Sequence, residues 1–287
     1  MKVLVTGSKG QLGSEIRNIA NNYKQLDFYF TDRDTLNVCD FFDVKKFVES
    51  NKIEAIINCA AYTQVDQAGN DRENAFKINS SAISNLVQVS EEQNIKLIHI
   101  STDYVFDGTN HIPYKENDVT STIGVYGMSK LEGENFLVNS NANGIVIRTS
   151  WLYSQFGANF VKTMMRLGRE RDSLGVISDQ IGSPTNARDL AVSCLEILSK
   201  NTKLNTNGHI YHFSNEGVAS WFDFAKAIME FADISCQVTP IETKDYPTPA
   251  KRPHYSVLNK SKIKEDFKIE IPYWRDSLKD CIENITK

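Results

Sequence analysis

The sequence has no long hydrophobic run and no excess of positive charge. Its apolar runs, such as residues 55–57 and 59–62, fall far short of the roughly 20 residues that a membrane helix needs. Residues 1–5 also reach a Thr-Gly turn too soon to be the core of a signal peptide. The chain has 32 Lys and Arg residues against 36 Asp and Glu residues, and its net charge of -4 does not favour binding to a phosphate backbone. We therefore expect no membrane and no nucleic acid among its partners.

Cysteine and histidine are few and scattered. The five cysteines are odd in number and include no Cys-x-x-Cys pair, which argues against a disulfide framework and favours a reducing, cytoplasmic location. Of the five histidines, His209 and His212 lie three residues apart in an expected strand, so they would face opposite sides of it. The sequence thus predicts no metal site.

The first half of the chain alternates short β-branched runs with amphipathic helical segments. Leu12, Ile16 and Ile19 recur at helical spacing, and Asp40 is placed to cap the helix that follows it. The pattern predicts strands at 2–6, 27–31, 55–58, 96–101 and 145–149 and helices at 11–21, 41–49, 72–93 and 126–138. Because parallel strands need crossover connections, we expect an α/β fold with a doubly wound parallel sheet.

The second half breaks this rhythm and predicts a smaller unit of mixed α/β structure. Helices are expected at 159–171, 187–199, 221–232 and 273–285, with strands at 174–177 and 210–213. The segment that contains Pro247, Pro249 and Pro253 suits a substrate-facing loop. At about 150 residues per domain, we expect residues 1–150 to form the first domain, rejoined by about 186–214. Residues 151–185 and 215–287 would form the second.

A glycine-rich turn joins the first expected strand to the first helix and reads Gly7-Ser8-Lys9-Gly10-Gln11-Leu12-Gly13. A phosphate at a helix N-terminus meets unpaired backbone N–H groups and the positive end of the helix dipole. Glycine is needed because a Cβ would block both the turn and the approach of a pyrophosphate. The turn therefore predicts a Rossmann-like domain that binds NADPH or NADH. The alternative is a tight strand–helix turn without a ligand.

The residues that follow the next two strands bear on the choice of cofactor. Asp32 could accept hydrogen bonds from an adenosine ribose, which favours NAD, whereas Arg33 could pair with a 2′-phosphate, which favours NADP. A solvated charged turn is a third interpretation of these residues. Ala60 and Ala61, followed by Tyr62, leave room for a flat cofactor, although a packed strand end would have the same composition.

Tyr126 and Lys130 lie one turn apart on the same face of an expected helix. An ammonium group there would favour the tyrosinate, and moving the phenol pKa from about 10 toward neutrality takes roughly 4 kcal/mol. Such a phenol could exchange a proton with a substrate oxygen. By itself, however, Tyr-x-x-x-Lys is expected about once by chance at this composition, and a surface helix explains it equally well.

Two further residues strengthen the interpretation of this pair. Thr102 follows the fourth strand, at the sheet edge where a nicotinamide would lie, so its hydroxyl could bind the same carbonyl oxygen as Tyr126. Asn79, in the long helix, either holds a water that relays protons to Lys130 or is a buried capping amide. The glycine turn and these residues occur in the order that a dehydrogenase needs.

Taken together, these motifs resemble the extended short-chain dehydrogenase/reductase superfamily and, within it, the dTDP-4-dehydrorhamnose reductase family. The resemblance runs nearly end to end, and its most specific parts are Ser101–Gly108 and Asp179–Thr185. The other matching stretches are Val5–Gly13, Asn58–Thr63 with Val65 and Asp66, Pro113–Glu116, Val125–Glu134, Arg148–Trp151, Asn159–Phe160, Ser220–Phe222 and Arg252–Pro253. The chain departs from the family in three places: residues 121–124 lack the usual proline, Asn37 replaces a common Asp, and the Asp32-Arg33 pair leaves the cofactor preference mixed.

The resemblance implies reduction of the C4 ketone of dTDP-4-dehydro-L-rhamnose by NADPH or NADH, in a monomer or homodimer. It makes Tyr126 the proton donor, Lys130 its partner and ribose anchor, and Thr102 the carbonyl contact. It brings Asp40 near the adenine. The residues that it implies on the sugar nucleotide are Asp103, Tyr104, Trp151, Asn159 and Phe160, with Arg252 on the diphosphate. Core packing between the domains is the alternative for Trp151 and Phe160.

Two other functions remain to be compared with the reductase. A nucleotide-sugar dehydratase of the same superfamily would carry an Asp-Glu pair after the strand-end threonine, whereas this chain has Asp103-Tyr104. Because a tyrosine of ordinary pKa is a poor substitute for a carboxylate, the reductase is favoured. A non-catalytic NADP-binding regulatory subunit would need the glycines but not Thr102, Tyr126 and Lys130 together.

Overall fold

The computed structural model describes residues 1–200, 203–206 and 208–287. Residues 201, 202 and 207 lie outside the described part of the chain, and all three fall within the 186–214 segment that was expected to rejoin the first domain. The predicted boundaries between the two domains stay a prediction.

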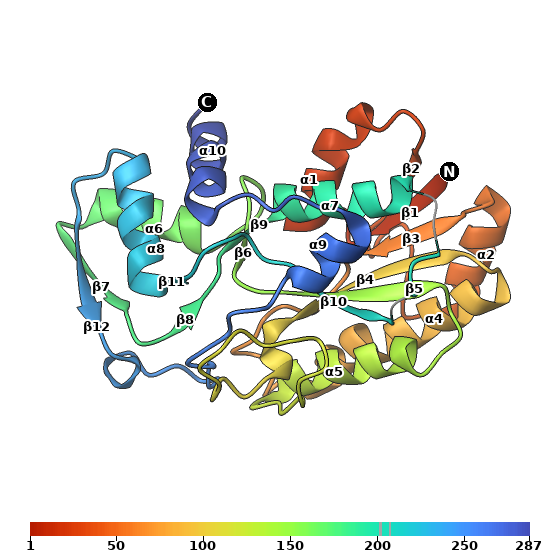
Figure 1. Cartoon of the computed structure of the whole chain (residues 1–287), viewed down its shortest axis with the longest axis horizontal. Helices are drawn as coiled ribbons and strands as arrows, with labels where there is room; N and C mark the ends of the chain where they lie inside the picture. The colour runs from red at the N-terminus through yellow and green to blue at the C-terminus, as the bar shows by residue number, and fades with distance from the viewer. Residues whose placement is uncertain (201–202, 207) are drawn as a thin grey trace.

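Six strands form the central sheet, in the order β10-β5-β4-β3-β1-β2 (Figure 1). Every neighbouring pair in it is parallel. The chain runs from β1 to β2 on one side and then crosses to β3 on the other, so the topological switch point lies between β1 and β3. The six strands are β1 (Lys2–Thr6), β2 (Asp27–Phe30), β3 (Ala55–Asn58), β4 (Lys96–Thr102), β5 (Gly144–Thr149) and β10 (Ile210–His212).

Helices cover both faces of this sheet, because its buried strand side chains alternate between them. Val3 and Val5 pack in one cluster with residues of α1 (Gln11–Ile19), α7 (Ala187–Ser199) and α9 (Ser261–Phe267). Leu4 packs in another cluster with residues of α2 (Phe41–Asn51), α4 (Ala82–Glu92) and α5 (Val125–Val138). Figure 1 shows the sheet between these two layers. The predicted doubly wound α/β fold is confirmed.

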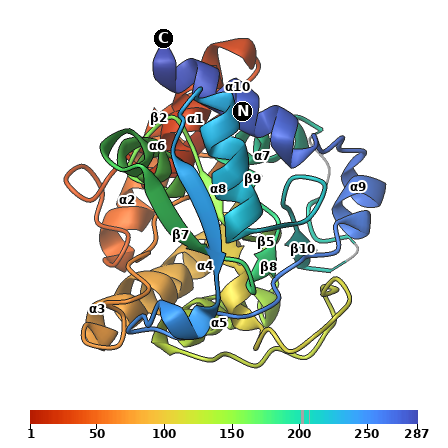
Figure 2. The same ribbon diagram turned by 90° about the vertical axis from the view of Figure 1, so that its left-hand side faces the viewer.

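A smaller unit with its own core lies at one end of the sheet, on the left of Figure 1 and facing the viewer in Figure 2. Three helices build most of this core, namely α6 (Phe160–Glu170), α8 (Trp221–Phe231) and α10 (Trp274–Thr286). Against them lies a parallel pair of strands, β7 (Ser173–Ile177) and β12 (Gln237–Ile241). Two short pairs complete the unit: β6 (Leu152–Tyr153) with β9 (Thr185–Asn186), and β8 (Ile181–Gly182) with β11 (Ala219–Ser220).

The predicted elements differ from the observed ones mainly at interruptions and in short strands. The helix expected at 72–93 is divided by a π-helical turn, Lys77–Ser81, between α3 (Arg72–Phe76) and α4. The short strands β6, β8, β9 and β11 have only two residues each, which is too few for a periodic pattern. Asp40 does cap α2, since its carboxylate accepts from the backbone N–H groups of Phe42 and Asp43.

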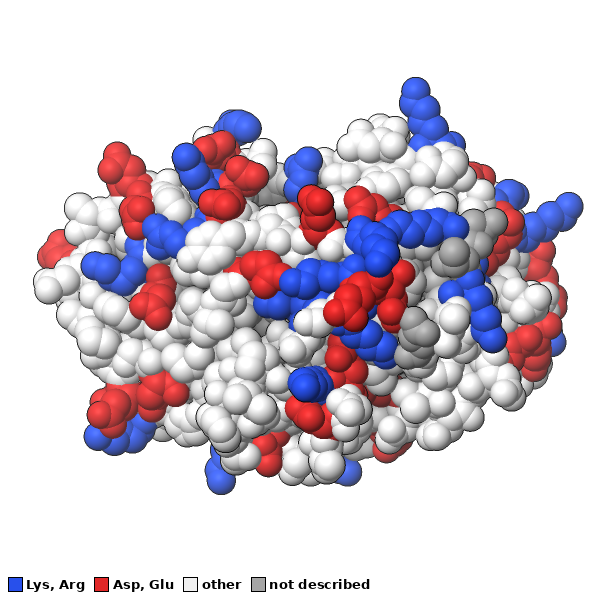
Figure 3. Space-filling view, viewed as in Figure 1, with Lys and Arg blue, Asp and Glu red and all other residues white. Residues whose placement is uncertain are grey.

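The surface carries charges of both signs. On the face drawn in Figure 3, Lys and Arg side chains lie next to Asp and Glu side chains in several groups, one of them near the centre, with uncharged surface between these groups. No helix in the described residues is long and apolar enough to cross a membrane.

Candidate active site

The glycine turn directs the start of α1 toward the carboxyl edge of the sheet. Gly7 has a φ of +61°, and a Cβ there would lie 2.6 Å from the backbone nitrogen of Ala60. A Cβ at Gly13 would lie 2.5 Å from Cα of Ser8, so only glycine lets α1 pack against the turn. Gly10 is the N-cap of α1, and no described side chain caps the helix there. The N-terminal N–H groups of α1 are therefore available to an anion.

Two adjoining cavities open at this edge, and they share Gly10, Cys59 and Ala61. The first cavity, of about 680 Å³, lies beside the glycine turn and the turn that follows β2; Lys9, Asp32 and Arg33 line it. The second cavity, of about 560 Å³, extends from the start of α1 toward the smaller unit; Thr102, Tyr126 and Trp151 line it. Together they form an elongated site at the switch point of the sheet, where α/β proteins bind ligands.

The structure brings Tyr126, Lys130 and Thr102 to the second cavity, as the sequence indicated. Lys130 is only 2% exposed, and its Nζ donates a hydrogen bond to the backbone oxygen of Ile100 at 2.7 Å. The ring of Tyr104 meets the ring of Tyr126 edge to face, with the centroids 5.4 Å apart. These contacts hold the ammonium group and the phenol ring in place, and both residues line the cavity.

The expected direction of the Tyr126 pKa was wrong. Burial raises the pKa of Tyr126 to about 12, although a hydrogen bond with Thr102 partly opposes this shift. Burial also lowers the pKa of Lys130 to about 8, while Glu134 acts in the opposite direction. Spacing on a helix could not reveal how strongly desolvation penalises both charged forms. The consequence is a phenol that keeps its proton at neutral pH and can donate it.

Asp103 is a buried carboxyl group on the wall of the same cavity. Its Oδ1 accepts a hydrogen bond from the hydroxyl of Thr102 at 3.0 Å, and Ser256 also favours its ionised form. Burial raises the pKa of Asp103 to about 6, and the hydrogen bond from Thr102 reduces this shift. The neighbouring Tyr104 lines the cavity too, and burial raises its pKa, so its phenol also stays protonated.

Asn79 lies in the π-helical turn and outside both cavities. Its Nδ2 donates to the backbone oxygen of Tyr62 and to Oγ of Ser129, each at 3.0 Å, and its Oδ1 accepts from the backbone nitrogen of Tyr62. Both N–H bonds are therefore engaged, and neither reaches Lys130. This arrangement matches the buried amide that was the alternative to a proton relay.

Trp151 and Asn159 extend the second cavity toward the smaller unit. Trp151 has a φ of 49°, and its ring stacks on Trp221 with the centroids 3.7 Å apart. Asn159 caps α6 and also donates to Oε1 of Gln11 at 2.9 Å, so it connects the two units. Phe160 lies outside the cavity and packs against Trp221 instead. Trp221 supports the site but was not predicted to do so. The signal that could have identified it is its place in Ser220–Phe222, one of the stretches that resemble the reductase family.

The structure does not bring Arg252 into either cavity. Its guanidinium forms a two-point ion pair with Asp66, at 3.0 Å and 2.7 Å. It also donates to the backbone oxygen of Ala250 at 3.1 Å. The expectation that Arg252 neutralises a diphosphate therefore has no support in this arrangement, because its guanidinium already has a carboxylate partner.

Most, but not all, of the residues expected around the cofactor line one of the two cavities. Gly7, Gly10, Asp32, Arg33, Ala60 and Ala61 line the first cavity, and Gln11 and Leu12 line the second. Gly13 lines neither cavity but lets α1 pack against the glycine turn. The carboxylate of Asp40 accepts a hydrogen bond from the backbone of Phe42 and so caps α2. Lys9 also lines the first cavity, although nothing in the sequence predicted that it contacts the cofactor.

The family model described as RmlD substrate binding domain matches residues 1–287. The dTDP-4-dehydrorhamnose reductase of Aggregatibacter actinomycetemcomitans is 40% identical over 289 residues, which cover 97% of each chain. The chain belongs to the RmlD family of dTDP-4-dehydrorhamnose reductases.

Solved structures of RmlD-family proteins are similar along the whole chain. The dTDP-4-dehydrorhamnose reductase of Clostridium acetobutylicum is 38% identical, with a TM-score of 0.94 over 100% of both chains. The enzyme of Bacillus anthracis, whose structure is a complex with NADP, is 37% identical, with a TM-score of 0.92 over 99% of both chains.

Proposed function

We propose that this protein reduces the C4 ketone of dTDP-4-dehydro-L-rhamnose to dTDP-L-rhamnose with NADPH or NADH. The observation that carries the proposal is the protonated phenol of Tyr126 beside Thr102 and Lys130, in a cavity that adjoins the uncapped start of α1. Membership of the RmlD family supports the choice of sugar nucleotide.

The residues of the first cavity fit a nicotinamide dinucleotide. A Cβ at Gly10 would meet only the backbone oxygen of Gly7, at 3.2 Å, so this glycine leaves the space next to the start of α1 open. A pyrophosphate there would face the N–H groups of α1, and the volume of about 680 Å³ is in the range of ligand pockets. When bound, the reduced nicotinamide supplies the hydride.

Three side chains would then handle the proton and the developing charge. Tyr126 donates its proton to O4 of the sugar as the carbonyl oxygen becomes an alkoxide. The ammonium group of Lys130, held by Ile100, stabilises the tyrosinate that remains, because opposite charges attract strongly in a buried site. Thr102 orients the phenol through their hydrogen bond. Trp151 and Asn159 form the wall on the substrate side of the second cavity.

The dehydratase alternative needs a base next to the acid Asp103. Tyr104 stands in that position, and its raised pKa keeps it from acting as one. The regulatory-subunit alternative needs no proton donor at the second cavity. Neither alternative is favoured by an observation of its own.

A coupled assay tests the proposal directly. The purified protein is mixed with dTDP-4-dehydro-L-rhamnose and with each reduced nicotinamide in turn, and the absorbance of the reduced cofactor is followed. We expect cofactor oxidation that matches the formation of dTDP-L-rhamnose. Binding of the cofactor without its oxidation would favour the regulatory subunit instead.

The remaining predictions concern organisation and location. We propose that residues 1–150 with about 186–214 bind the cofactor and that 151–185 with 215–287 bind the sugar nucleotide, in a monomer or homodimer. The five cysteines are free thiols, which supports a reducing, cytoplasmic location.

A further inference from the structure

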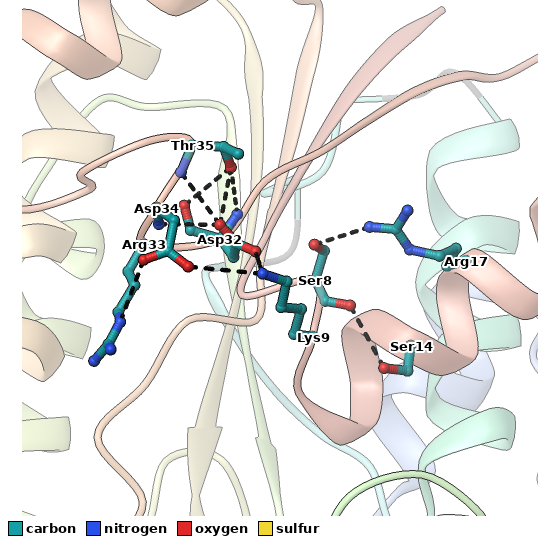
Figure 4. A network of polar contacts seen from close by, with 8 residues as sticks. All are labelled: Ser8, Lys9, Ser14, Arg17, Asp32, Arg33, Asp34 and Thr35. Atoms are coloured by element: carbon teal, nitrogen blue, oxygen red, sulfur yellow. Dashed lines mark hydrogen bonds and ion pairs between the residues drawn. The ribbon is translucent and has the colours of Figure 1, made fainter.

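A lysine in the glycine turn makes an ion pair with the aspartate that follows β2. Lys9 Nζ contacts Oδ2 of Asp32, and it lies 3.7 Å from Oδ2 of Asp34 (Figure 4). The ion pair raises the pKa of Lys9 and lowers the pKa of Asp32 to about 2, so both groups are charged at neutral pH. Lys9 and Asp32 both line the first cavity.

The other oxygen of Asp32 is occupied by its own turn. Oδ1 accepts from the backbone nitrogens of Asp34 and Thr35, at 3.0 Å and 3.2 Å, and from Oγ1 of Thr35 at 3.1 Å. A ribose 2′-hydroxyl would have to reach Oδ2, which Lys9 holds. The acidic residue that normally favours NAD is therefore neutralised and shielded by Lys9.

Two cationic side chains near Asp32, those of Lys9 and Arg33, could bind a 2′-phosphate in the first cavity. Arg33 also lines the first cavity; its side chain is 95% exposed, and its only described ion pair is with Asp34, at 3.6 Å. Arg17 is committed elsewhere, since it donates to Oγ of Ser8 at 3.0 Å (Figure 4). Its guanidinium also lies over the ring of Phe30. A phosphate that carries up to two negative charges could draw Lys9 from Asp32 and bind Arg33 as well.

We propose that Lys9 determines the cofactor preference, because it blocks Asp32 from the ribose of NADH and supplies the main cation for the 2′-phosphate of NADPH. This inference rests on the proposed function only in taking a nicotinamide dinucleotide as the ligand of the first cavity. Arg33 has a smaller, additive part, since its side chain is 95% exposed and therefore more strongly solvated than that of Lys9.

The test measures dissociation constants of NADPH and NADH without substrate, by calorimetry or by the fluorescence of the reduced nicotinamide. We expect the wild-type protein to bind NADPH more tightly. Lys9→Gln should weaken NADPH by about 10-fold or more, the value of one charge-assisted contact, and should leave NADH unchanged or tighter. Asp32→Asn should strengthen NADPH, because it releases Lys9, and should leave NADH unchanged, because Lys9 keeps Asp32 from the ribose in the wild-type protein. Since the side chain of Lys9 is exposed, Lys9→Gln should leave the fold intact, and Asp32→Asn keeps an oxygen that can accept from the turn.

Lys45→Gln is the matched control, because Lys45 forms a comparable ion pair with Glu92 at 2.7 Å and lines neither cavity. It should leave both constants unchanged. A pair of 5′-ADP and 2′,5′-ADP then isolates the adenosine end, and Lys9→Gln should weaken only the second.

Two results would overturn the inference. One is a ratio of the two dissociation constants that stays within twofold of wild type in Lys9→Gln. The other is an equal loss of both cofactors, which would place Lys9 on the pyrophosphate. Neither result depends on turnover, so a protein that binds NADPH selectively but does not reduce the sugar nucleotide would contradict the proposed function alone.

Discussion

Thr102 donates its hydroxyl hydrogen to Asp103, at 3.0 Å, on the wall of the second cavity. Thr102 also forms a hydrogen bond with Tyr126, and because this bond lowers the pKa of the phenol, it favours the tyrosinate that remains after proton transfer. The one hydroxyl hydrogen of Thr102 therefore has two acceptors, the carboxylate of Asp103 and the oxygen of Tyr126. We expect it to turn toward Tyr126 once the phenol has given up its proton.

The first prediction concerns Tyr126→Phe. Removing the phenolic hydroxyl deletes the proton donor but keeps the ring that packs against Tyr104, so we expect kcat to fall by about 10² to 10⁴ and the dissociation constant of NADPH to stay within about twofold. Steady-state kinetics and cofactor titration measure the two quantities. A variant with near-normal kcat would remove Tyr126 from its role.

The second prediction concerns the stability of Asp103→Asn. The pKa of Asp103 is about 6 in the folded protein against 3.8 in the unfolded chain, so ionisation opposes folding. This penalty is fully present above pH 6 and disappears as pH falls below about 3.8. The variant should gain at most about 3 kcal/mol in the free energy of unfolding at pH 7.5. Urea denaturation at pH 7.5 and at pH 3.5 measures it, and a gain of equal size at both values would contradict the assignment.

The third prediction concerns Lys130→Met. Burial lowers the pKa of Lys130 to about 8 from 10.5, so its charge opposes folding below pH 8, and the penalty disappears as pH rises toward 10.5. The variant should lose at least about 10² in kcat, because the tyrosinate loses its countercharge. It should gain up to about 3 kcal/mol in stability at pH 7, less the lost hydrogen bond to Ile100. A loss of both activity and stability would contradict the stated cost of burying this ammonium.

The fourth prediction concerns a buried ion pair beneath the site. Arg148 and Glu134 meet at 2.7 Å with side chains that are 4% and 1% exposed. Glu134→Gln leaves a buried guanidinium without a countercharge and should cost about 3 to 5 kcal/mol in the free energy of unfolding. Glu170→Gln is the control, because its pair with Arg166 is exposed and should matter by less than about 1 kcal/mol. Equal effects of the two substitutions would contradict this contrast.

The sequence predicted those features of the fold that are determined by residues close together in the chain. The glycine turn, the cap at Asp40 and the alternation of strands and helices are all set within a few residues. The topology that follows from them brings Thr102 and Tyr126 to one edge of the sheet, since the carboxyl ends of parallel strands meet there. This is why the fold and the central residues of the candidate site could be predicted.

The rest depended on partners that are distant in the sequence or on burial. Arg252 pairs with Asp66, 186 residues away, and nothing near Arg252 in the sequence indicates this contact. The raised pKa of Tyr126 depends on desolvation, which helical spacing does not reveal. Strand β12 contains Pro240, and in the described part of the chain it pairs only with β7. Such an edge position tolerates the missing N–H group, but a proline in the sequence argues against a strand, so this strand was not predicted.

The most direct test of the central claim follows the transferred hydrogen itself. The protein is given dTDP-4-dehydro-L-rhamnose and NADPH that carries deuterium at both positions of the reactive carbon of the nicotinamide, and the sugar is examined by NMR. We predict one deuterium at C4 of dTDP-L-rhamnose for each NADPH oxidised, and formation of this labelled product about 10² to 10⁴ times more slowly in Tyr126→Phe. Unlabelled C4, or a sugar recovered unchanged while the cofactor stays bound and reduced, would contradict the account.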